Sequence, residues 1–123
     1  MPLYSESGSK VLLASQDAHT IARISTRLKP LTPHTIVDAQ ALQKELASIR
    51  KRGYAIGQQE SRLGVSGCSA PVWDASGALV ASLGISGPSE RLTKARLTAL
   101  ASKVVAAANQ LSASLGWRLR PND

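Results

Sequence analysis

The segment 53–88 constrains the fold most, because two apolar runs rich in small residues flank a turn at 74–77. Gly77 can adopt a positive φ without steric cost, and the aspartate that opens the turn can accept hydrogen bonds from the backbone beyond it. This pattern predicts a β-hairpin with strands at about 67–73 and 78–86. Small residues on a strand are typical of a surface that a ligand or another backbone approaches closely. Such positions here are Gly67, Ser69, Ala70 and Gly84.

Helices are predicted on both sides of the hairpin, over about 5–14, 17–28, 39–52 and 93–115. The third has the clearest signals, because its apolar residues recur at helical spacing between an N-cap candidate, Asp38, and a helix-ending glycine, Gly53. Ser5 or Ser7 is the expected cap of the first helix, and Asp17 that of the second.

The order of the predicted elements indicates the fold class. A strand is expected to begin at Tyr54, and a polar connection at 58–63 separates it from the hairpin. The last helix is expected to bury one apolar stripe and to end at Gly116. That stripe consists of Leu97, Leu100, Val104, Ala108, Leu111 and Leu115. Helices, consecutive strands and a final helix predict an α+β fold, with an antiparallel sheet flanked by helices.

A chain of 123 residues fits one domain with a modest core. Its net charge of +7 suits anionic partners. However, the basic residues are spread along the chain, and their one cluster, at 50–52, suits the negative end of a helix. We therefore interpret the charge as solvated helix faces. No apolar run is long enough to span a membrane, and no secretory pattern opens the chain. A single cysteine favours a reducing compartment, so we expect a cytoplasmic protein.

The residues that carry chemistry are few. Cys68 with His19 or His34 is the candidate for thiol catalysis, but no third orienting group accompanies them, and a lone cysteine in a strand is more often a small buried hydrophobe. One cysteine, two separated histidines and scattered carboxylates match no metal-ligand spacing. No glycine-rich phosphate loop opens a helix. We expect no catalytic residue, no metal and no cofactor, and keep a small enzyme that uses Cys68 as an alternative.

Several short motifs follow one another along the chain. They are Pro2-Leu3-Tyr4, Ser7-Gly8-Ser9-Lys10, Leu31-Thr32-Pro33-His34-Thr35-Ile36, Gly53-Tyr54-Ala55, Glu60, Gly64-Val65, Ala70-Pro71-Val72, Asp74, Gly77, Ile85-Ser86-Gly87-Pro88 and Arg91-Leu92-Thr93. In residues and order they resemble the C-terminal effector-binding domain of IclR-type transcriptional regulators. We expect this domain, or its C-terminal portion, over 1–116 and a tail over 117–123. The family's N-terminal winged helix-turn-helix and its early strands have no counterpart in these motifs.

The resemblance implies a GAF-like or profilin-like sheet, with a small effector, usually a carboxylate, between the sheet and the shorter helices. Ser86 matches a binding serine of the family, and the helix start at 7–10 borders the pocket, where an anion is favoured. The residues alone equally allow a hydroxyl that satisfies the backbone and plain N-capping. The candidate effector-binding residues are Ser7, Gly8, Ser9, Leu12, Gly57, Gly67, Cys68, Gly84 and Ser86.

The resemblance also implies that DNA is bound only through the winged helix-turn-helix. Because the missing family strands would leave a sheet edge or apolar face uncovered, we expect a homodimer or homotetramer, and we expect no membrane partner. The chain departs from the family where Gly57, Gly67 and Gly84 replace polar or cysteine anchors. Because glycine removes side-chain volume, we expect a roomier pocket and an effector larger than a two- or three-carbon acid. A dimerisation module without a ligand stays a second alternative.

Overall fold

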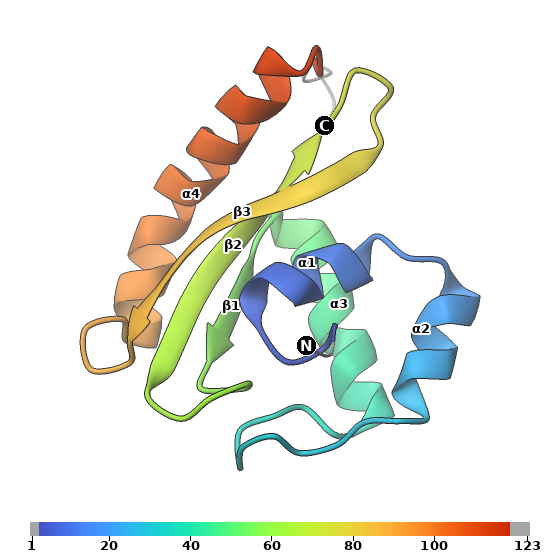
Figure 1. Ribbon diagram of the computed structural model, residues 1–123, viewed down its shortest axis with the longest axis vertical. Helices are drawn as coiled ribbons and strands as arrows, with labels where there is room; N and C mark the ends of the chain where they lie inside the picture. Colours follow the sequence, from blue (N-terminus) through green and yellow to red (C-terminus); the bar gives the residue numbers. More distant parts are fainter. Residues whose placement is uncertain (1–2, 119–123) are drawn as a thin grey trace.

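The computed structural model describes residues 3–118 of the chain. Its elements follow in the order α1 (Ser7–Ala14), α2 (Ala18–Ser25), α3 (Ala39–Arg52), β1 (Ala55–Gln58), β2 (Val65–Trp73), β3 (Leu79–Pro88) and α4 (Lys94–Ser114). The strands of this part form one antiparallel sheet in the order β1-β2-β3. Figure 1 shows α4 along one side of the sheet and α1, α2 and α3 grouped on the other. The predicted α+β fold is confirmed.

The helix termini follow from local side chains. Asp17 accepts a hydrogen bond from the Thr20 N–H at 2.7 Å and so caps α2, and Gly53 ends α3 with a φ of 84°. The predicted caps of α1 are wrong, because Glu6 takes that position. Its side chain accepts from the backbone of Ser9 while the Glu6 N–H donates to Ser9 Oγ at 3.3 Å, which satisfies two donors at once.

The β2–β3 hairpin forms as predicted. Gly77 has a φ of 84°, and Asp74 Oδ1 accepts hydrogen bonds from the N–H groups of Ser76 at 2.9 Å and Ala78 at 3.1 Å. These bonds fix the tight turn. Both strands extend beyond the predicted ends, since β2 begins at Val65 and β3 continues to Pro88.

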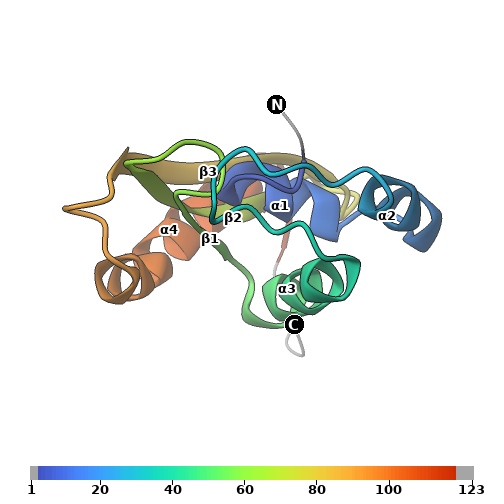
Figure 2. The same cartoon turned by 90° about the horizontal axis from the view of Figure 1, so that it is seen from below.

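The sheet has two chemically different faces, because adjacent side chains point in opposite directions. The face toward α4 is apolar, and Cys68, Ala70 and Val72 of β2 pack there against Leu97 and Val104. The opposite face carries glycine and serine and lies under α1, while a second core joins α1 to α2 and α3. Figure 2 shows α1 directly beside the sheet and α2 farther out.

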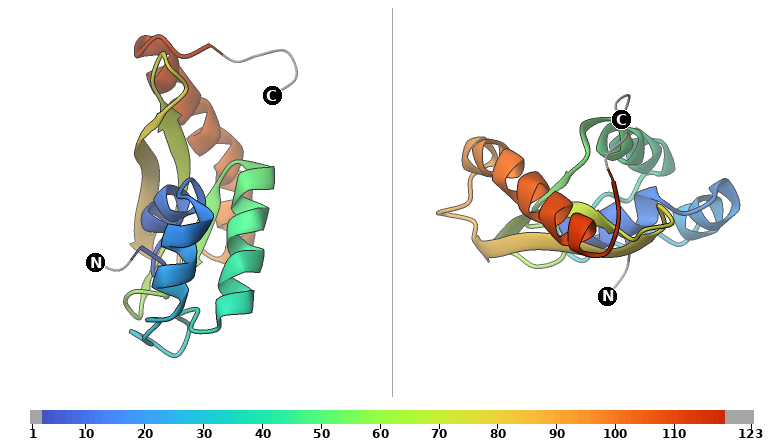
Figure 3. Two further views of the ribbon diagram at one scale, coloured as in Figure 1. Left: turned by 90° about the vertical axis from the view of Figure 1, so that its right-hand side faces the viewer. Right: turned by 90° about the horizontal axis from the view of Figure 1, so that it is seen from above.

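The buried stripe of α4 differs from the predicted one at its end. Leu111 and Leu115 are exposed by 42% and 45%, whereas Ser112 is fully buried. Ser112 Oγ accepts the Trp73 N–H at 2.9 Å, so the end of β2 lies against the last turn of the helix. Figure 3 shows the hairpin turn beside this end of α4. A small residue allows that approach where leucine would separate the two elements.

β3 is an edge strand of the described sheet and is largely exposed, including Val80 and Ile85. No helix within 3–118 is long and apolar enough to cross a membrane. The domain limits at 1–116 and 117–123 stay a prediction. Most of that tail, together with the first residue of the motif that begins at Pro2, lies outside the described residues.

Candidate functional site

The glycines that replace the expected anchors allow α1 and neighbouring backbone to approach the sheet closely. A Cβ on Gly57 would lie 3.0 Å from the Ser7 nitrogen. A Cβ on Gly67 or Gly84 would lie 2.5 Å from a backbone carbonyl oxygen of the adjacent strand. Ser7 Oγ and Ser69 Oγ, 2.9 Å apart, join α1 to β2. The small residues here therefore allow close packing of one backbone against another. The sequence pattern allowed either this or the close approach of a ligand.

A small polar cavity remains at the first turn of α1. Its volume is about 40 Å³, far below the roughly 300–1,000 Å³ of typical ligand pockets. The predicted roomier pocket is therefore not found here, because the start of α1 lies close above Gly57 and Gly67, and Ser69 of β2 lies close to Gly84. The lining consists of Ser5, Glu6, Ser7, Gly57, Glu60, Ser61, Val65, Ser66, Gly67 and Ser86. The structure thus brings together four predicted site residues: Ser7, Gly57, Gly67 and Ser86.

The cavity contains two carboxylates. Glu6 caps α1 with its own side chain, so an internal carboxylate already lies at the positive helix end. Glu60 on the opposite wall is paired with Lys10, whose Nζ lies 3.1 Å from both carboxylate oxygens. Burial raises the pKa of Glu60 above its ordinary value, and the Lys10 ammonium opposes that shift. Sequence reasoning missed both glutamates as site residues.

The buried Lys10–Glu60 pair connects α1 to the end of β1. Lys10 is fully buried, and its Nζ also donates to the Ile56 carbonyl oxygen at 2.8 Å. Glu60 Oε2 accepts the Gln58 N–H at 3.2 Å. The position of α1 is therefore coupled by side-chain hydrogen bonds to the strand that supplies Gly57.

The segment after β1 is held by threonines from the connection between α2 and α3. Gln59 has a positive φ of 56°, which is uncommon for a residue with a side chain. Thr32 Oγ1 donates to the Gln59 carbonyl oxygen, and Thr35 Oγ1 donates to that of Glu60, each at 2.5 Å. These bonds give the motif at 31–36 a structural role in positioning Glu60.

The other predicted site residues do not line this cavity. Cys68 is fully buried on the opposite face of the sheet, beneath α4. Gly84 packs against Ser69, and a Cβ on Gly8 would lie near Ser82 and Ser69 Oγ. Ser9 belongs to the α1 cap. Leu12 is half-buried, one turn beyond Gly8 on α1. Because successive side chains of a strand point to opposite faces of the sheet, Cys68 and its neighbour Gly67 are expected on different faces.

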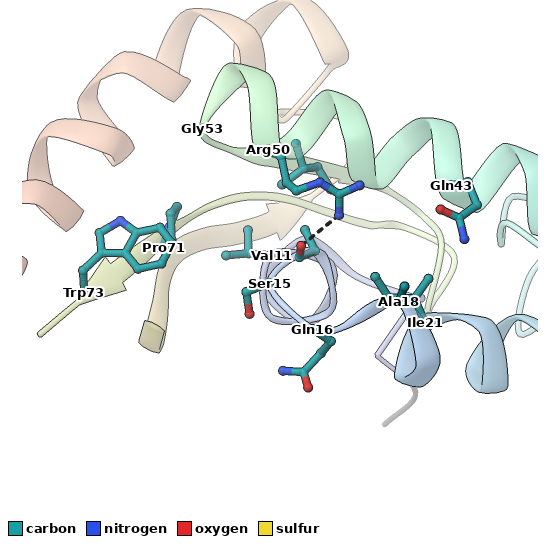
Figure 4. Close-up of a pocket in the computed structure, with 12 residues that line it drawn as sticks. Val11, Ser15, Gln16, Ala18, Ile21, Gln43, Arg50, Gly53, Pro71 and Trp73 are labelled. Carbon is teal, nitrogen blue, oxygen red and sulfur yellow. Dashed lines mark hydrogen bonds between the residues drawn. The ribbon is translucent and has the colours of Figure 1, made fainter. Parts of the chain in front are cut away.

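A second, larger cleft of about 640 Å³ lies at the other end of α1. Figure 4 shows Pro71 and Trp73 of β2 at one end of the cleft, Ala18 and Ile21 of α2 at the other end, and Arg50 of α3 above Val11 of α1. The lining consists of Val11, Ala14, Ser15, Gln16, Ala18, Ile21, Gln43, Ile49, Arg50, Gly53, Pro71 and Trp73. Sequence reasoning did not identify this cleft, because its residues come from four elements with no shared motif.

The structure does not assemble the alternative catalytic group. Burial raises the pKa of the Cys68 thiol, which keeps it in the less nucleophilic protonated form. His19 and His34 are exposed, whereas Cys68 lies in the core under α4. Among residues 3–118, no group of three or more histidine, cysteine or acidic side chains is arranged to hold a metal ion.

The chain is thus an α+β domain with a small polar cavity between a short helix and an antiparallel sheet. Residues 1–113 match the family model described as "Bacterial transcriptional regulator IclR C-terminal". The chain therefore belongs to the IclR C-terminal family, as the motifs predicted.

Relatives support this assignment. The HTH-type transcriptional repressor AllR of Escherichia coli (strain K12) is 33% identical over 124 residues, which cover 98% of this chain and 45% of AllR. The chain thus spans about half the length of the curated relatives it matches. The repressor BlcR of Agobacterium tumefaciens superposes with a TM-score of 0.89 at 29% identity, covering 97% of this chain and 48% of BlcR.

A third comparison concerns a ligand complex. The inducer-binding domain of the transcription factor PobR from Acinetobacter, a double mutant in complex with 3-hydroxybenzoic acid, superposes with a TM-score of 0.83 at 29% identity. The match covers 91% of this chain and 66% of that domain. These relatives are transcriptional regulators, and the PobR domain is described as inducer-binding.

Proposed function

We propose that this chain is the effector-sensing part of a transcriptional regulator and that α1 is its sensing element. The observation that carries the proposal is the polar cavity at the first turn of α1, where Ser7, Gly57, Gly67 and Ser86 meet. Family membership and the inducer complex of PobR support it. We assign the chain no catalytic role.

The chemistry of the cavity favours a small effector with hydrogen-bond donors. Glu6 and Glu60 present two carboxylates beside a single ammonium, that of Lys10. A further carboxylate there would meet like charge, so the carboxylate that the resemblance implied suits this cavity less well. With about 40 Å³ of space, little more than the roughly 30 Å³ that one water occupies in the liquid, the cavity admits only a very small hydroxyl-bearing molecule of at most two carbons.

In the complete regulator, we propose that effector binding alters the position of α1 and that the change passes to a winged helix-turn-helix that contacts DNA. A homodimeric or homotetrameric assembly in the cytoplasm agrees with this role. The charge of the present chain, +7, is then a property of its solvated helices and not a DNA footprint.

Isothermal titration with glycolaldehyde, glycolate and glyoxylate tests the proposed site. We expect the uncharged compound to bind most tightly, and Ser86→Val to weaken binding at least tenfold, because Ser86 lines the cavity. Ser82→Val is the matched control, since Ser82 lies on the same face of β3 but outside the cavity. Equal effects of the two variants, or no binding by any of the three compounds, would contradict the proposal.

A further inference from the structure

The cleft at the end of α1 differs from the first cavity in size and in charge. At about 640 Å³ it lies within the range of sites that enclose drug-sized ligands. Arg50 is the one charged residue among the described residues that line it, and no carboxylate accompanies it. The first cavity, in contrast, is small and is lined by two acidic residues, Glu6 and Glu60.

The floor of the cleft is apolar. Val11, Ile21 and Ile49 are each at most 4% exposed and belong to the core between α1, α2 and α3. Pro71 and Trp73, at the end of β2, are half-buried and form one wall. Figure 4 shows both rings on one side of the cleft. Such a surface favours an apolar ligand body, and aromatic residues in a concave site add contact area.

Arg50 supplies a fixed cationic group at this apolar surface. Its Nη1 donates to the Ala14 carbonyl oxygen at 2.9 Å, which closes the end of α1 and orients the guanidinium. A guanidinium carries five N–H donors, so one such bond leaves others for a ligand. In the described part of the chain Arg50 has no carboxylate partner, whereas Arg52 in the same turn pairs with Glu45 at 3.1 Å.

From this combination we propose that the cleft binds a monocarboxylate with an apolar body. The carboxylate accepts hydrogen bonds from the free N–H groups of Arg50, a geometry that guanidinium and carboxylate favour. The apolar body lies over Val11 and Ile49 and against the ring of Trp73. The amides of Gln16 and Gln43 are further polar groups of the lining. The site is separate from the cavity at the first turn of α1.

The test uses the two tryptophans of the chain. In the Trp117→Phe background, Trp73 is the only tryptophan, so its fluorescence reports the cleft directly. Octanoate should change this fluorescence saturably, and octanamide, which has the same body without the charge, should bind at least tenfold more weakly. Glyoxylate should leave the signal unchanged, because it lacks the apolar body.

Two variants, each with a control variant, decide whether Arg50 and the cleft carry the binding. Arg50→Gln should weaken octanoate binding at least tenfold, whereas Lys51→Gln, which changes the net charge equally outside the lining, should change it less than twofold. Ser15→Phe should fill the cleft and abolish binding of both octanoate and octanamide, with circular dichroism confirming folding. Ser86→Val should leave octanoate binding unchanged, which separates this proposal from the first cavity. Equal effects of Arg50→Gln and Lys51→Gln, or no saturable signal with octanoate, would overturn the proposal.

Discussion

Lys10 is fully buried, yet its ammonium makes three hydrogen bonds, to Glu60 and to the Ile56 carbonyl oxygen. A buried ion pair is weak evidence for stability, because the desolvation of both charges offsets their attraction. Removing only one partner is different, since an uncompensated charge then remains in the core. We therefore expect the pair to fix the position of α1 more than it stabilises the domain.

Lys10→Met should destabilise the domain by about 3–5 kcal/mol, because it leaves Glu60 without its ammonium partner. The double variant Lys10→Met/Glu60→Leu should recover most of that loss, since it removes both charges. Urea unfolding followed by circular dichroism measures both free energies of unfolding. A double variant as unstable as Lys10→Met would show that the pair contributes net stability by itself.

Gly84 provides a second test at the residue scale. A Cβ there would collide with Ser69 Oγ and lie 2.5 Å from the Cys68 carbonyl oxygen. Gly84→Ala should therefore cost about 1–3 kcal/mol. Gly87→Ala on the same strand is the control, because its Cβ would meet only the mobile end of Leu92 at 3.3 Å. Thermal unfolding of the two variants compares them, and equal midpoints would contradict the packing described.

Among the elements, those specified by neighbouring residues were predictable. Asp38 and Gly53 mark the two ends of α3, and the turn at 74–77 forms as its sequence indicated. The space above the small strand residues was not predictable in the same way. The β1–β2 register pairs Gly57 with Gly67, and only tertiary packing shows that α1 lies close above them.

The hairpin turn gives a pH prediction. The hydrogen bonds that Asp74 accepts from Ser76 hold the pKa of its carboxyl below the ordinary value, and those from Ala78 and Gly77 add to this. A lowered folded-state pKa stabilises the fold above the unfolded-state pKa, and this contribution is lost as pH falls through the folded-state value. Asp74→Asn keeps an acceptor but does not titrate. Its deficit in unfolding free energy should therefore shrink between pH 6 and pH 3, and a constant deficit would contradict this role.

Features that depend on how separate helices and strands meet could not be predicted from the sequence. Leu111 and Leu115 continue a helical stripe, but the described sheet ends near Ser112, so both leucines are exposed. The cleft around Arg50 likewise depends on how four elements meet. Helical periodicity specifies which side of a helix is apolar, but not how far its partner extends.

For the molecule as a whole, the edge of β3 is the most consequential surface. The strand Leu79–Pro88 carries no charged residue. Its edge borders an apolar groove lined by Leu83, Gly84, Ile85, Leu100, Lys103, Val104 and Ala107. Edge strands of monomeric proteins usually carry charges, proline or bulges that prevent pairing. In β3 the proline is the last residue and the irregularity lies at the hairpin end, opposite Val72 and Trp73, so the middle of the strand carries none of these features. We therefore expect a second copy to pair with β3, because an antiparallel strand pair can be formed symmetrically by identical strands.

Sedimentation velocity at increasing protein concentration measures this self-association. Ile85→Lys should weaken it at least tenfold, since it places a charge in the groove beside Lys103. Val37→Lys is the matched control, because it changes another half-exposed β-branched residue to lysine in the connection before α3. A purely monomeric wild-type chain at high concentration, or equal weakening by both variants, would contradict β3 pairing.

The short α1 helix has a consequence for regulation. Its eight residues span about 12 Å, with the small cavity at the first turn and the larger cleft at the last. Two ligands that each prefer one placement of the same rigid helix are linked thermodynamically, and each changes the affinity of the other by the same factor. With both proposed sites in use, a domain built in this way would integrate two chemical signals, one polar and one apolar, through the position of one helix.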